Sequence, residues 1–314
     1  MADSTLYPTA YRTHSLGQIQ TQGADLLDKE VTICGYAQAI RGKGKICFLD
    51  LRDGTGLCQV FLKQGMVDDD VLSSVQNSSR ESTIQFTGSV AQKRAPKVAE
   101  GEPAPPPEYE VVATGVNILS QAATPLPLGV TDTVHVELDT RLDNRFLDLR
   151  RTHVNAIFNL RAKILQYGRE HLISEGFKEI NTPKIIAAAA EGGTNLFPMK
   201  YFERDAYLSQ SPQLYKQLAI LGGLERVFEI GPAFRAENHD TYRHLNEFVS
   251  FDIEMAWAND EDVMAVQERM IHHIWSSVAA NDGKEIEAIN VFRRTQEMDD
   301  IIVEVPSIPF PRVE

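Results

Sequence analysis

The side chains best suited to chemistry lie between Arg226 and Trp257. Arg235 carries a rigid fork of N–H donors that matches two phosphate oxygens. Glu237, two residues further on, can accept a hydrogen bond from an exocyclic amine, and Phe248 can stack on a purine, with each stacked base worth about 1–3 kcal/mol. Together these groups could hold ATP without a glycine-rich phosphate loop, and the sequence contains no GxxxxGK[ST] string.

Two paired strands are needed to bring these side chains together. Apolar residues recur at every second position on both sides of a polar break at 238–243, which is the period of a strand with one buried face. We therefore predict a long antiparallel hairpin with a core face and a polar face. A plain solvated sheet face is the alternative, but such a face is richer in Lys, Thr and Gln. The predicted polar face carries Arg235, Glu237, His244, Asp252 and Glu254 around Phe248.

The first part of the chain predicts a different architecture. Short strand patterns span 31–39, 46–52, 57–63, 83–91 and 109–119, and the polar stretch at 68–79 suits a short helix. Five strands with a helix between the third and the fourth have the order of an OB-fold β-barrel. The Pro-rich segment at 95–107 cannot be a central strand, so we expect an excursion between the last two strands.

The second part of the chain has helical periodicity. Apolar residues form a helical stripe at 154–173, with Thr152 and Gly176 as suitable caps. A short strand at 178–180 and a second helical run at 260–280 follow. We predict an α+β protein with a five-stranded OB-fold at 1–120, a linker at 121–140, and an antiparallel sheet flanked by helices at 141–314.

Composition is that of an ordinary globular protein, with 43% hydrophobic and 24% charged residues. The net charge of −13 repels bulk nucleic acid, so any contact with nucleic acid needs a local basic patch. Residues 1–20 lack the apolar core of a signal peptide and no apolar run reaches transmembrane length, so we expect a cytoplasmic protein without membrane contact. Cys34, Cys47 and Cys58 lack metal-type spacing and lie in strand patterns, which predicts buried reduced thiols.

Several strings, in their order along the chain, resemble class II aminoacyl-tRNA synthetases. Residues 234–237, the loop after them and 243–248 are similar to motif 2 of that class. The helix at 154–175, with its strand and Pro183, resembles motif 1, which builds the dimer interface, and 140–150 resembles the start of the catalytic domain in the subgroup for Asp, Asn and Lys. The resemblance implies an ATP site formed by Arg235, Ala236, Glu237, Arg243, His244, Leu245 and Phe248, with Arg235 catalytic.

The amino-acid substrate is indicated by the string from Ser211 to Lys216, which resembles aspartyl-tRNA synthetases of the archaeal type. Lys216 would supply the fixed cation for a side-chain carboxylate, whereas a neutral amide would leave a buried ammonium group unpaired. A solvated helix lysine is the other interpretation. The resemblance implies that Glu191, Gln213, Lys216 and Arg235 bind L-aspartate, with Glu191 in a loop that closes over the substrate and meets its α-ammonium group.

The predicted barrel resembles the anticodon-binding module of the same subgroup. Phe48 and Gln59 fall on successive strands, and in that family a Phe and a Gln at this separation contact anticodon bases, as OB-folds read unpaired RNA. Arg41 lies in a basic turn before them. The implied anticodon-binding residues are therefore Arg41, Phe48 and Gln59. The alternatives are a buried core position for Phe48 and a merely solvated basic turn.

The resemblance as a whole implies aspartate–tRNA ligase activity with ATP and Mg²⁺, with tRNA(Asp) as partner, tRNA(Asn) left open, and a homodimer through motif 1. Motif 3 and the acidic Mg²⁺ ligands of the family are not found before Glu314. We therefore expect these 314 residues to be an inactive fragment with an incomplete sheet and unknown metal ligands. Two other functions stay open: a non-catalytic tRNA-binding synthetase fragment, and a synthetase-like asparagine synthetase, which lacks an anticodon module.

Overall fold

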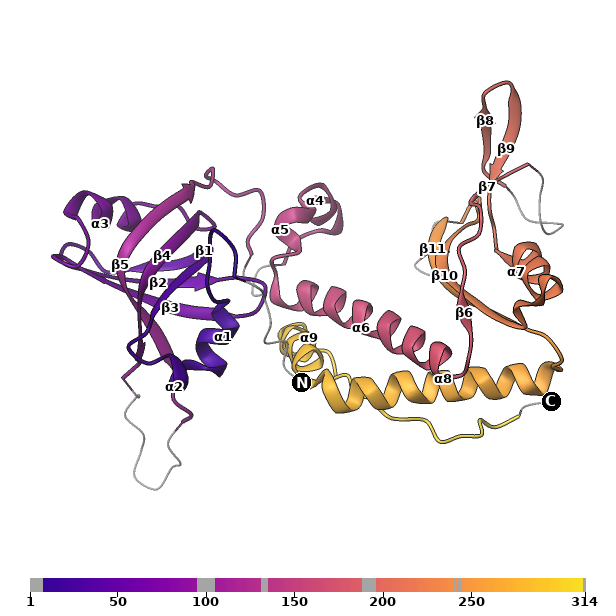
Figure 1. Cartoon of the computed structure of the whole chain (residues 1–314). Coiled ribbons are helices and arrows are strands. Elements are labelled where there is room, and N and C mark those ends of the chain that lie inside the picture. Colours follow the sequence, from indigo (N-terminus) through magenta and orange to yellow (C-terminus); the bar gives the residue numbers. More distant parts are fainter. Residues whose placement is uncertain are drawn as a thin grey trace. The chain divides into compact units, whose positions relative to one another are not determined.

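The computed structural model describes residues 8–94, 105–130, 135–187, 196–239, 241 and 244–312. Its contacts divide the chain into two compact units, Met1–Arg151 and Thr152–Glu314. Figure 1 shows a barrel in the first unit and a sheet with helices in the second, so the protein has a mixed α+β fold. Most of the predicted Pro-rich excursion, residues 95–104, lies outside the described residues.

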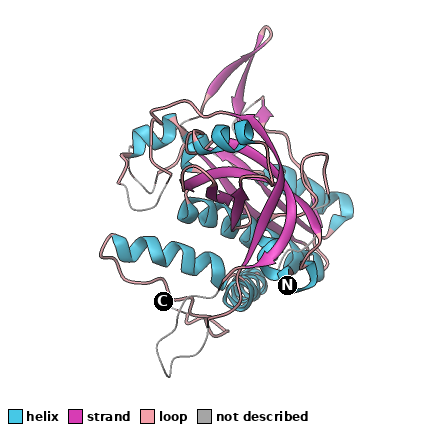
Figure 2. Ribbon diagram, turned by 90° about the vertical axis from the view of Figure 1, so that its left-hand side faces the viewer, coloured by secondary structure: helices cyan, strands magenta, loops and turns pink. Residues whose placement is uncertain are grey.

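The first unit is built on a closed five-stranded barrel, as predicted (Figures 1 and 2). The strands join in the order β1-β2-β3-β5-β4, and α3 lies where the polar stretch predicted a helix. Every second side chain of the strands points inward, and the core includes the fully buried Ile33, Leu49, Val60, Phe86 and Val111. The bounds in this unit are α1 Leu16–Thr21, α2 Gly23–Leu26, β1 Glu30–Arg41, β2 Ile46–Arg52, β3 Leu57–Lys63, α3 Asp69–Gln76, β4 Thr83–Gln92, β5 Tyr109–Ser120, α4 Leu138–Asp143 and α5 Arg145–Asp148.

The helix α1 belongs to the barrel core, although the sequence analysis did not predict it. Ser15 and Gln18 form a capping box, in which each side chain accepts a hydrogen bond from the backbone N–H of the other residue. Leu16 and Ile19 are fully buried among the barrel residues. The cap thus starts a helix only six residues long, and burial of its apolar face holds it in place.

A cluster of buried ion pairs holds the last residues of the first unit against the barrel. The guanidinium group of Arg150 donates to Glu81 Oε2 at 3.0 Å, and its central carbon lies 3.7 Å from the centre of the Tyr36 ring. Arg52 donates to both carboxylate oxygens of Glu81, at 3.0 and 3.1 Å, and to the carbonyl oxygen of Arg150 at 2.8 Å. The Glu81 side chain is only 5% exposed. The barrel therefore fixes the position of Arg150 through Glu81.

The second unit contains two three-stranded sheets. One has the order β11-β10-β6, with β11 antiparallel and β6 parallel to β10, and the other is antiparallel with the order β7-β9-β8. The helices α6 and α8 agree with the two predicted helical runs. The bounds are α6 Thr152–Ser174, β6 Lys178–Glu179, β7 Ile185–Ile186, β8 Pro198–Tyr201, β9 Arg204–Leu208, α7 Gln213–Ala219, a π-helix at Ile220–Leu224, β10 Arg226–Phe234, β11 Glu247–Met255, α8 Asp260–Asn281 and α9 Gly283–Thr295.

The predicted hairpin is formed by β10 and β11, with Phe228 opposite Ile253 and Ile230 opposite Phe251. These four side chains share one face and pack against α6 and α8. Burial of this face decides the register, because a shift by one residue would turn every apolar side chain away from the helices. The other members of this core are Leu172, Phe177, Met255, Val266 and Met270.

Gly168 lies where α6 rests directly on β11. A Cβ atom added there would lie 2.5 Å from Cε1 of Phe251. We expect Gly168→Ala to lower the free energy of unfolding by about 1–3 kcal/mol, because overpacking outweighs the helix preference of alanine. Urea unfolding followed by the fluorescence of Trp257 and Trp275 measures this change. Gly283→Ala is the control, since its Cβ would meet no atom within 4 Å; an equal loss in both variants would contradict the prediction.

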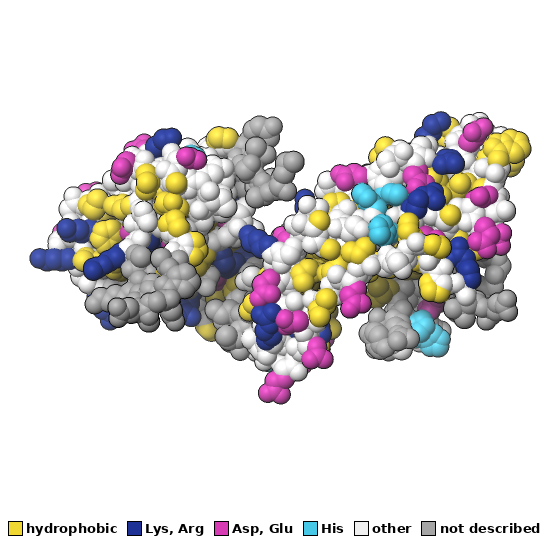
Figure 3. All heavy atoms as spheres, turned by 90° about the horizontal axis from the view of Figure 1, so that it is seen from below, with side chains coloured by type: hydrophobic (Ala, Val, Ile, Leu, Met, Phe, Trp, Pro, Cys, Tyr) yellow, Lys and Arg dark blue, Asp and Glu magenta, His cyan; other side chains and the backbone are white. Residues whose placement is uncertain are grey.

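Figure 3 shows histidine side chains gathered on one face of the second unit. Separately, a pair of histidines links α6 to α8. The rings of His171 and His273 are stacked with centroids 5.2 Å apart. Burial lowers the pKa of His171, despite Glu175 Oε1 at 3.2 Å from its Nε2. The hydrogen bonds from Arg269, at 2.6 and 2.7 Å, lower the pKa of Glu175. At neutral pH the two helices are therefore joined by a neutral imidazole and an ionised carboxylate.

Among the described residues, no helix combines the length and the apolar character needed to cross a membrane. All three cysteines are free thiols; Cys47 and Cys58 are buried, whereas Cys34 is only half-buried. Burial raises the pKa of Cys58 to about 12 and also raises the pKa of the other two thiols. None of the three is therefore a reactive thiolate at neutral pH.

Candidate active site and nucleic-acid interface

The polar face of the β10–β11 hairpin lies opposite the core face, as its period predicted. Directly opposed residues share a face, so Glu229 lies beside Asp252 and Gly231 beside Ser250. The helix α7 packs against both strands and brings Lys216 to this polar face. The hairpin and α7 together therefore form the candidate site for the amino acid.

Lys216 is buried on this face, with 3% of its surface exposed. Its Nζ lies 3.4 Å from Asp252 Oδ1, 3.6 Å from Glu254 Oε2 and 3.1 Å from the carbonyl oxygen of Ile253. Gln213, three residues earlier on α7, donates from Nε2 to Glu254 Oε2 at 3.0 Å. Lys216 is therefore not a solvated helix lysine, and its ammonium group is held between two carboxylates.

The connection between β10 and β11 brings the predicted nucleotide-binding side chains together. The guanidinium carbon of Arg235 lies 5.5 Å from the centre of the Phe248 ring, which is within the range of a cation–π contact. Glu237 Oε2 lies 3.7 Å from His244 Nε2, and the backbone N–H of Arg235 donates to the carbonyl oxygen of Asn246 at 2.9 Å. Arg235 and His244 are exposed, so both can meet a ligand.

Of the other four predicted site residues in this unit, the structure describes two. Ala236 is half-buried and Leu245 is 60% exposed, and both lie in the same connection as Arg235. Arg243 and Glu191 lie outside the described residues. The assignment of these four residues to ATP and aspartate stays a prediction.

Asp252 and Glu254 are site residues whose function the sequence did not indicate. Their spacing placed both on the polar face, but only the tertiary structure pairs them with Lys216. The hydroxyl group of Ser250 also donates to Asp252. The carboxylates on this face are therefore oriented by neighbours before any ligand arrives.

Glu229 lies on the same face but has a structural role. It is 2% exposed, and its carboxylate accepts hydrogen bonds from the backbone N–H and the hydroxyl group of Thr182, at 3.1 and 2.7 Å. Lys184 Nζ lies 2.9 Å from Glu229 Oε1. These contacts tie β10 to the segment after β6 and leave Glu229 unsuited to bind a substrate.

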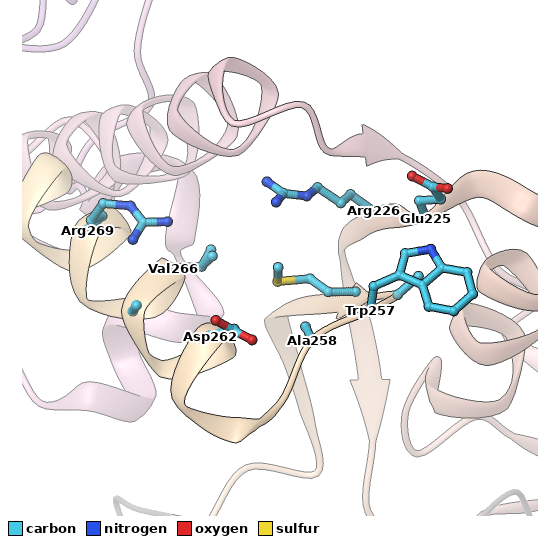
Figure 4. Close-up of a pocket in the computed structure, with 10 residues that line it drawn as sticks. Glu225, Arg226, Trp257, Ala258, Asp262, Val266 and Arg269 are labelled. Atoms are coloured by element: carbon cyan, nitrogen blue, oxygen red, sulfur yellow. The ribbon is translucent and has the colours of Figure 1, made fainter.

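A pocket of about 330 Å³ lies at the opposite end of the hairpin, beside the start of α8 (Figure 4). Trp257 stands at its rim with 92% of its surface exposed, and Arg226 and Arg269 line it. Arg226 donates to the carbonyl oxygen of Glu175 at 2.9 Å, and Arg269 is paired with the Glu175 carboxylate. Because both cations already have partners, this pocket is a weaker candidate for an anionic ligand than the connection at 235–246.

On the barrel, Phe48 points outward, because its neighbours Cys47 and Leu49 are fully buried. Phe48 lies opposite Phe61 on β3, and the two ring centroids are 5.1 Å apart. A buried core position for Phe48 is therefore wrong. The two rings form a half-buried aromatic pair on the outside of the barrel, which is the type of surface on which unpaired bases stack.

Gln59 and Arg41 lie near this aromatic pair and are both engaged in hydrogen bonds. Gln59 donates from Nε2 to Glu110 Oε2 at 2.7 Å. The Arg41 guanidinium group forms a two-point ion pair with Asp50 and lies 3.5 Å from Gln59 Oε1. Hydrogen bonding to Asp50 raises the pKa of Arg41. Arg41 must therefore share or leave Asp50 before it can bind an RNA phosphate.

Comparison with known proteins defines the class. Residues 137–313 match the family of class II tRNA synthetases (D, K and N), and residues 31–119 match the OB-fold nucleic acid binding domain. The chain belongs to the class II tRNA synthetases of the D, K and N group.

The similar proteins include ligases for aspartate and asparagine. The chain is 41% identical over 302 residues to the aspartate–tRNA(Asp/Asn) ligase of Methanococcoides burtonii, a match that covers 96% of the chain and 63% of that protein. It is 45% identical over 281 residues to the protein of the same name from Methanocaldococcus jannaschii, with 89% and 61% covered. The chain thus spans less than two thirds of the length of these relatives.

Solved structures agree with this relationship. The aspartyl-tRNA synthetase from Entamoeba histolytica has a TM-score of 0.72 and 34% identity, with 92% of this chain and 59% of that chain covered. The asparaginyl-tRNA synthetase from Pyrococcus horikoshii, complexed with asparaginyl-adenylate, has a TM-score of 0.76 and 28% identity, with 94% and 63% covered.

Proposed function

We propose that this chain is part of an aspartate–tRNA ligase, which joins L-aspartate to tRNA(Asp) with the use of ATP. The observation that carries the proposal is the buried ammonium group of Lys216, on the polar face of the hairpin that also carries Arg235, directly after β10, and Phe248, near the start of β11. Asp252 and Glu254 hold this ammonium group in place, and a substrate carboxylate that approaches it would gain a charge-assisted hydrogen bond, whereas a neutral amide would gain a weaker one. The match to class II synthetases and the names of the relatives support the same reaction.

The proposed reaction has two steps. An oxygen of the aspartate α-carboxylate attacks the α-phosphorus of ATP, and the bond to the oxygen that bridges to the β-phosphate breaks, which releases pyrophosphate. Arg235 would neutralise charge that builds on the phosphate oxygens, and Phe248 would stack on the adenine. The 3′-terminal hydroxyl group of tRNA then attacks the activated carbonyl carbon, loses its proton, and AMP leaves. These groups act mainly by position and charge.

We assign the remaining predicted residues to the amino acid and the nucleotide. Gln213 would orient aspartate, Glu191 would meet its α-ammonium group, and Glu237 and His244 would contact ATP. Among the described residues, no group of three His, Cys, Asp or Glu side chains is arranged to hold a metal ion. Mg²⁺ is commonly held by one or two carboxylates together with the phosphates of the substrate, so we propose that it accompanies ATP and leave its protein ligands unassigned.

We also propose that α6 joins two copies of the protein and that the ligase works in the cytoplasm. Ile157 and Phe158 on α6 are 47% and 42% exposed, and burial of such side chains favours association. Sedimentation equilibrium tests the dimer: a monomer at all concentrations would reject this part of the proposal.

Exchange of labelled pyrophosphate into ATP, with aspartate, asparagine and lysine in turn, tests the reaction. The first protein to assay contains these 314 residues and extends to the length of the relatives; its exchange should depend on aspartate alone. The second contains the 314 residues only, and it should show no exchange. Exchange that depends on asparagine would reject the assigned role of Lys216. Formation of asparagine from aspartate, ATP and ammonia would indicate a synthetase-like asparagine synthetase instead.

We expect Phe48→Ala to weaken binding of tRNA(Asp) by about 1–3 kcal/mol, or roughly five- to 150-fold, because a stacking ring is lost. Filter binding of tRNA(Asp) and tRNA(Asn) transcripts measures the effect and the preference between the two. Leu57→Ala is the control, since Leu57 is 46% exposed on β3 away from the aromatic pair. Equal affinities of the two variants would reject the anticodon role of Phe48.

A further inference from the structure

The β8–β9 hairpin ends in an exposed aromatic pair that the proposed function does not use. Strand pairing ends with Tyr201 opposite Arg204, which leaves Phe202 and Glu203 as a two-residue turn. Phe202 is 88% exposed and Tyr201 is 50% exposed, and their rings meet edge to face with centroids 5.0 Å apart. Figure 1 shows this hairpin standing away from the helices of the second unit.

Phe202 has a backbone conformation that suits glycine better. Its φ is 56°, and a positive φ at the first central position of a two-residue hairpin turn usually calls for Gly, Asn or Asp. A bulky side chain in this conformation is strained. Because the ring is almost fully exposed, packing offsets little of this strain. Folding alone therefore gives no reason for a phenylalanine at this position.

The hairpin rises beside the connection that holds the nucleotide-binding side chains. Directly after β9, the carbonyl oxygen of Ser209 accepts a hydrogen bond from the backbone N–H of Phe234 at 3.0 Å. Phe234 is the last residue of β10 and directly precedes Arg235. The base of the hairpin and the start of the 235–246 connection are therefore bonded neighbours.

The surroundings of the two rings favour a nucleobase over a protein partner. Lys200 and Asp205 form an ion pair across the strands, and Glu203 and Arg204 flank the rings. The apolar surface is thus two rings surrounded by charge, whereas stable protein interfaces bury on the order of 1,200 Å² or more. A single unpaired base can stack on one exposed ring, and a nearby arginine can pair with its phosphate.

We propose that Tyr201 and Phe202 stack on unpaired bases at the single-stranded 3′ end of tRNA and guide this end toward the 235–246 connection. The proposal rests on the proposed function, because that reaction requires the 3′ end of a tRNA at the nucleotide site. An open pocket of about 850 Å³, lined by the hairpin tip and by Ile185 and Ile186 of β7, leaves room for nucleotides beside the rings.

The test uses a tRNA(Asp) transcript with 2-aminopurine at its 3′ end and a second transcript without the terminal single-stranded nucleotides. The unchanged chain should quench the 2-aminopurine fluorescence by stacking. Phe202→Gly should strongly reduce the quenching and weaken binding of the complete transcript by about tenfold, with no change for the shortened one. Phe202→Tyr should retain both properties, and Leu221→Ala, which removes another side chain that is 84% exposed, should change neither.

Two further readouts separate the possible outcomes. Phe202→Gly should raise the midpoint of thermal unfolding, because glycine relieves the strain, so weaker binding cannot reflect loss of the fold. Unchanged quenching and affinity in this variant would overturn the proposal. A loss of self-association in sedimentation would also overturn it, because the hairpin tip would then contact a second copy of the chain. Binding that depends on Phe48 but not on Phe202 rejects only this inference, whereas no tRNA binding at all rejects the proposed function.

Discussion

Replacement of Lys216 by alanine is expected to weaken aspartate binding by about a hundredfold while changing the affinity for ATP by less than about threefold. The reason is the position of its ammonium group, 3.4 Å from Asp252 and 3.6 Å from Glu254. Without it, the side-chain carboxylate of aspartate would meet two carboxylates and no cation. The side chains assigned to ATP, Arg235 and Phe248, would stay in place.

This difference is measured by the KM values for aspartate and for ATP in the pyrophosphate exchange reaction. The assay uses a protein that contains these residues and extends to the length of the relatives. Lys163→Ala is a matched control, because Lys163 is an exposed lysine on α6. Thermal unfolding of each variant shows whether unpaired carboxylates disturb the fold. Similar losses for aspartate and ATP in a folded Lys216→Ala variant would reject the side-chain role of this residue.

The second large effect is expected at Glu81, where alanine should lower the free energy of unfolding of the barrel by about 3–5 kcal/mol. The Glu81 carboxylate binds both Arg52 and Arg150, whose side chains are only 15% and 21% exposed. Its removal leaves two partly buried guanidinium groups without their common partner. We expect the chain at Arg150 to separate from the barrel in this variant.

Amide hydrogen exchange in β1 and β4 measures this change, since both tryptophans, Trp257 and Trp275, lie in the second unit and do not report on the barrel. Glu108→Ala is the control, because its ion pair with Lys93 is exposed and should contribute about 1 kcal/mol or less. Glu81→Gly removes the carboxylate but suits the φ of 67°, so it separates loss of the ion pairs from backbone strain. A Glu81→Ala effect no larger than that of Glu108→Ala would contradict the prediction.

The elements that could be predicted are those with a strong local period. The strands β2 and β3 occupy the predicted ranges 46–52 and 57–63, because inward and outward side chains alternate without a break. The helices α6 and α8 have long apolar stripes that bury one face. In contrast, α1 is too short to show a period, and the β8–β9 hairpin carries its aromatic residues in solvent, where no burial pattern marks a strand.

By itself, the sequence determined the family, the barrel, the main hairpin and the face of that hairpin on which polar chemistry would gather. Only the tertiary structure showed that Lys216 is buried against Asp252, a residue 36 positions away along the chain, and that Arg41 is already bound to Asp50. The physical reason is that a period along the chain states which way a side chain points, whereas its partner depends on how separate elements pack. When a cation and a carboxylate come from segments far apart in the sequence, neither segment contains a local pattern that indicates their pairing.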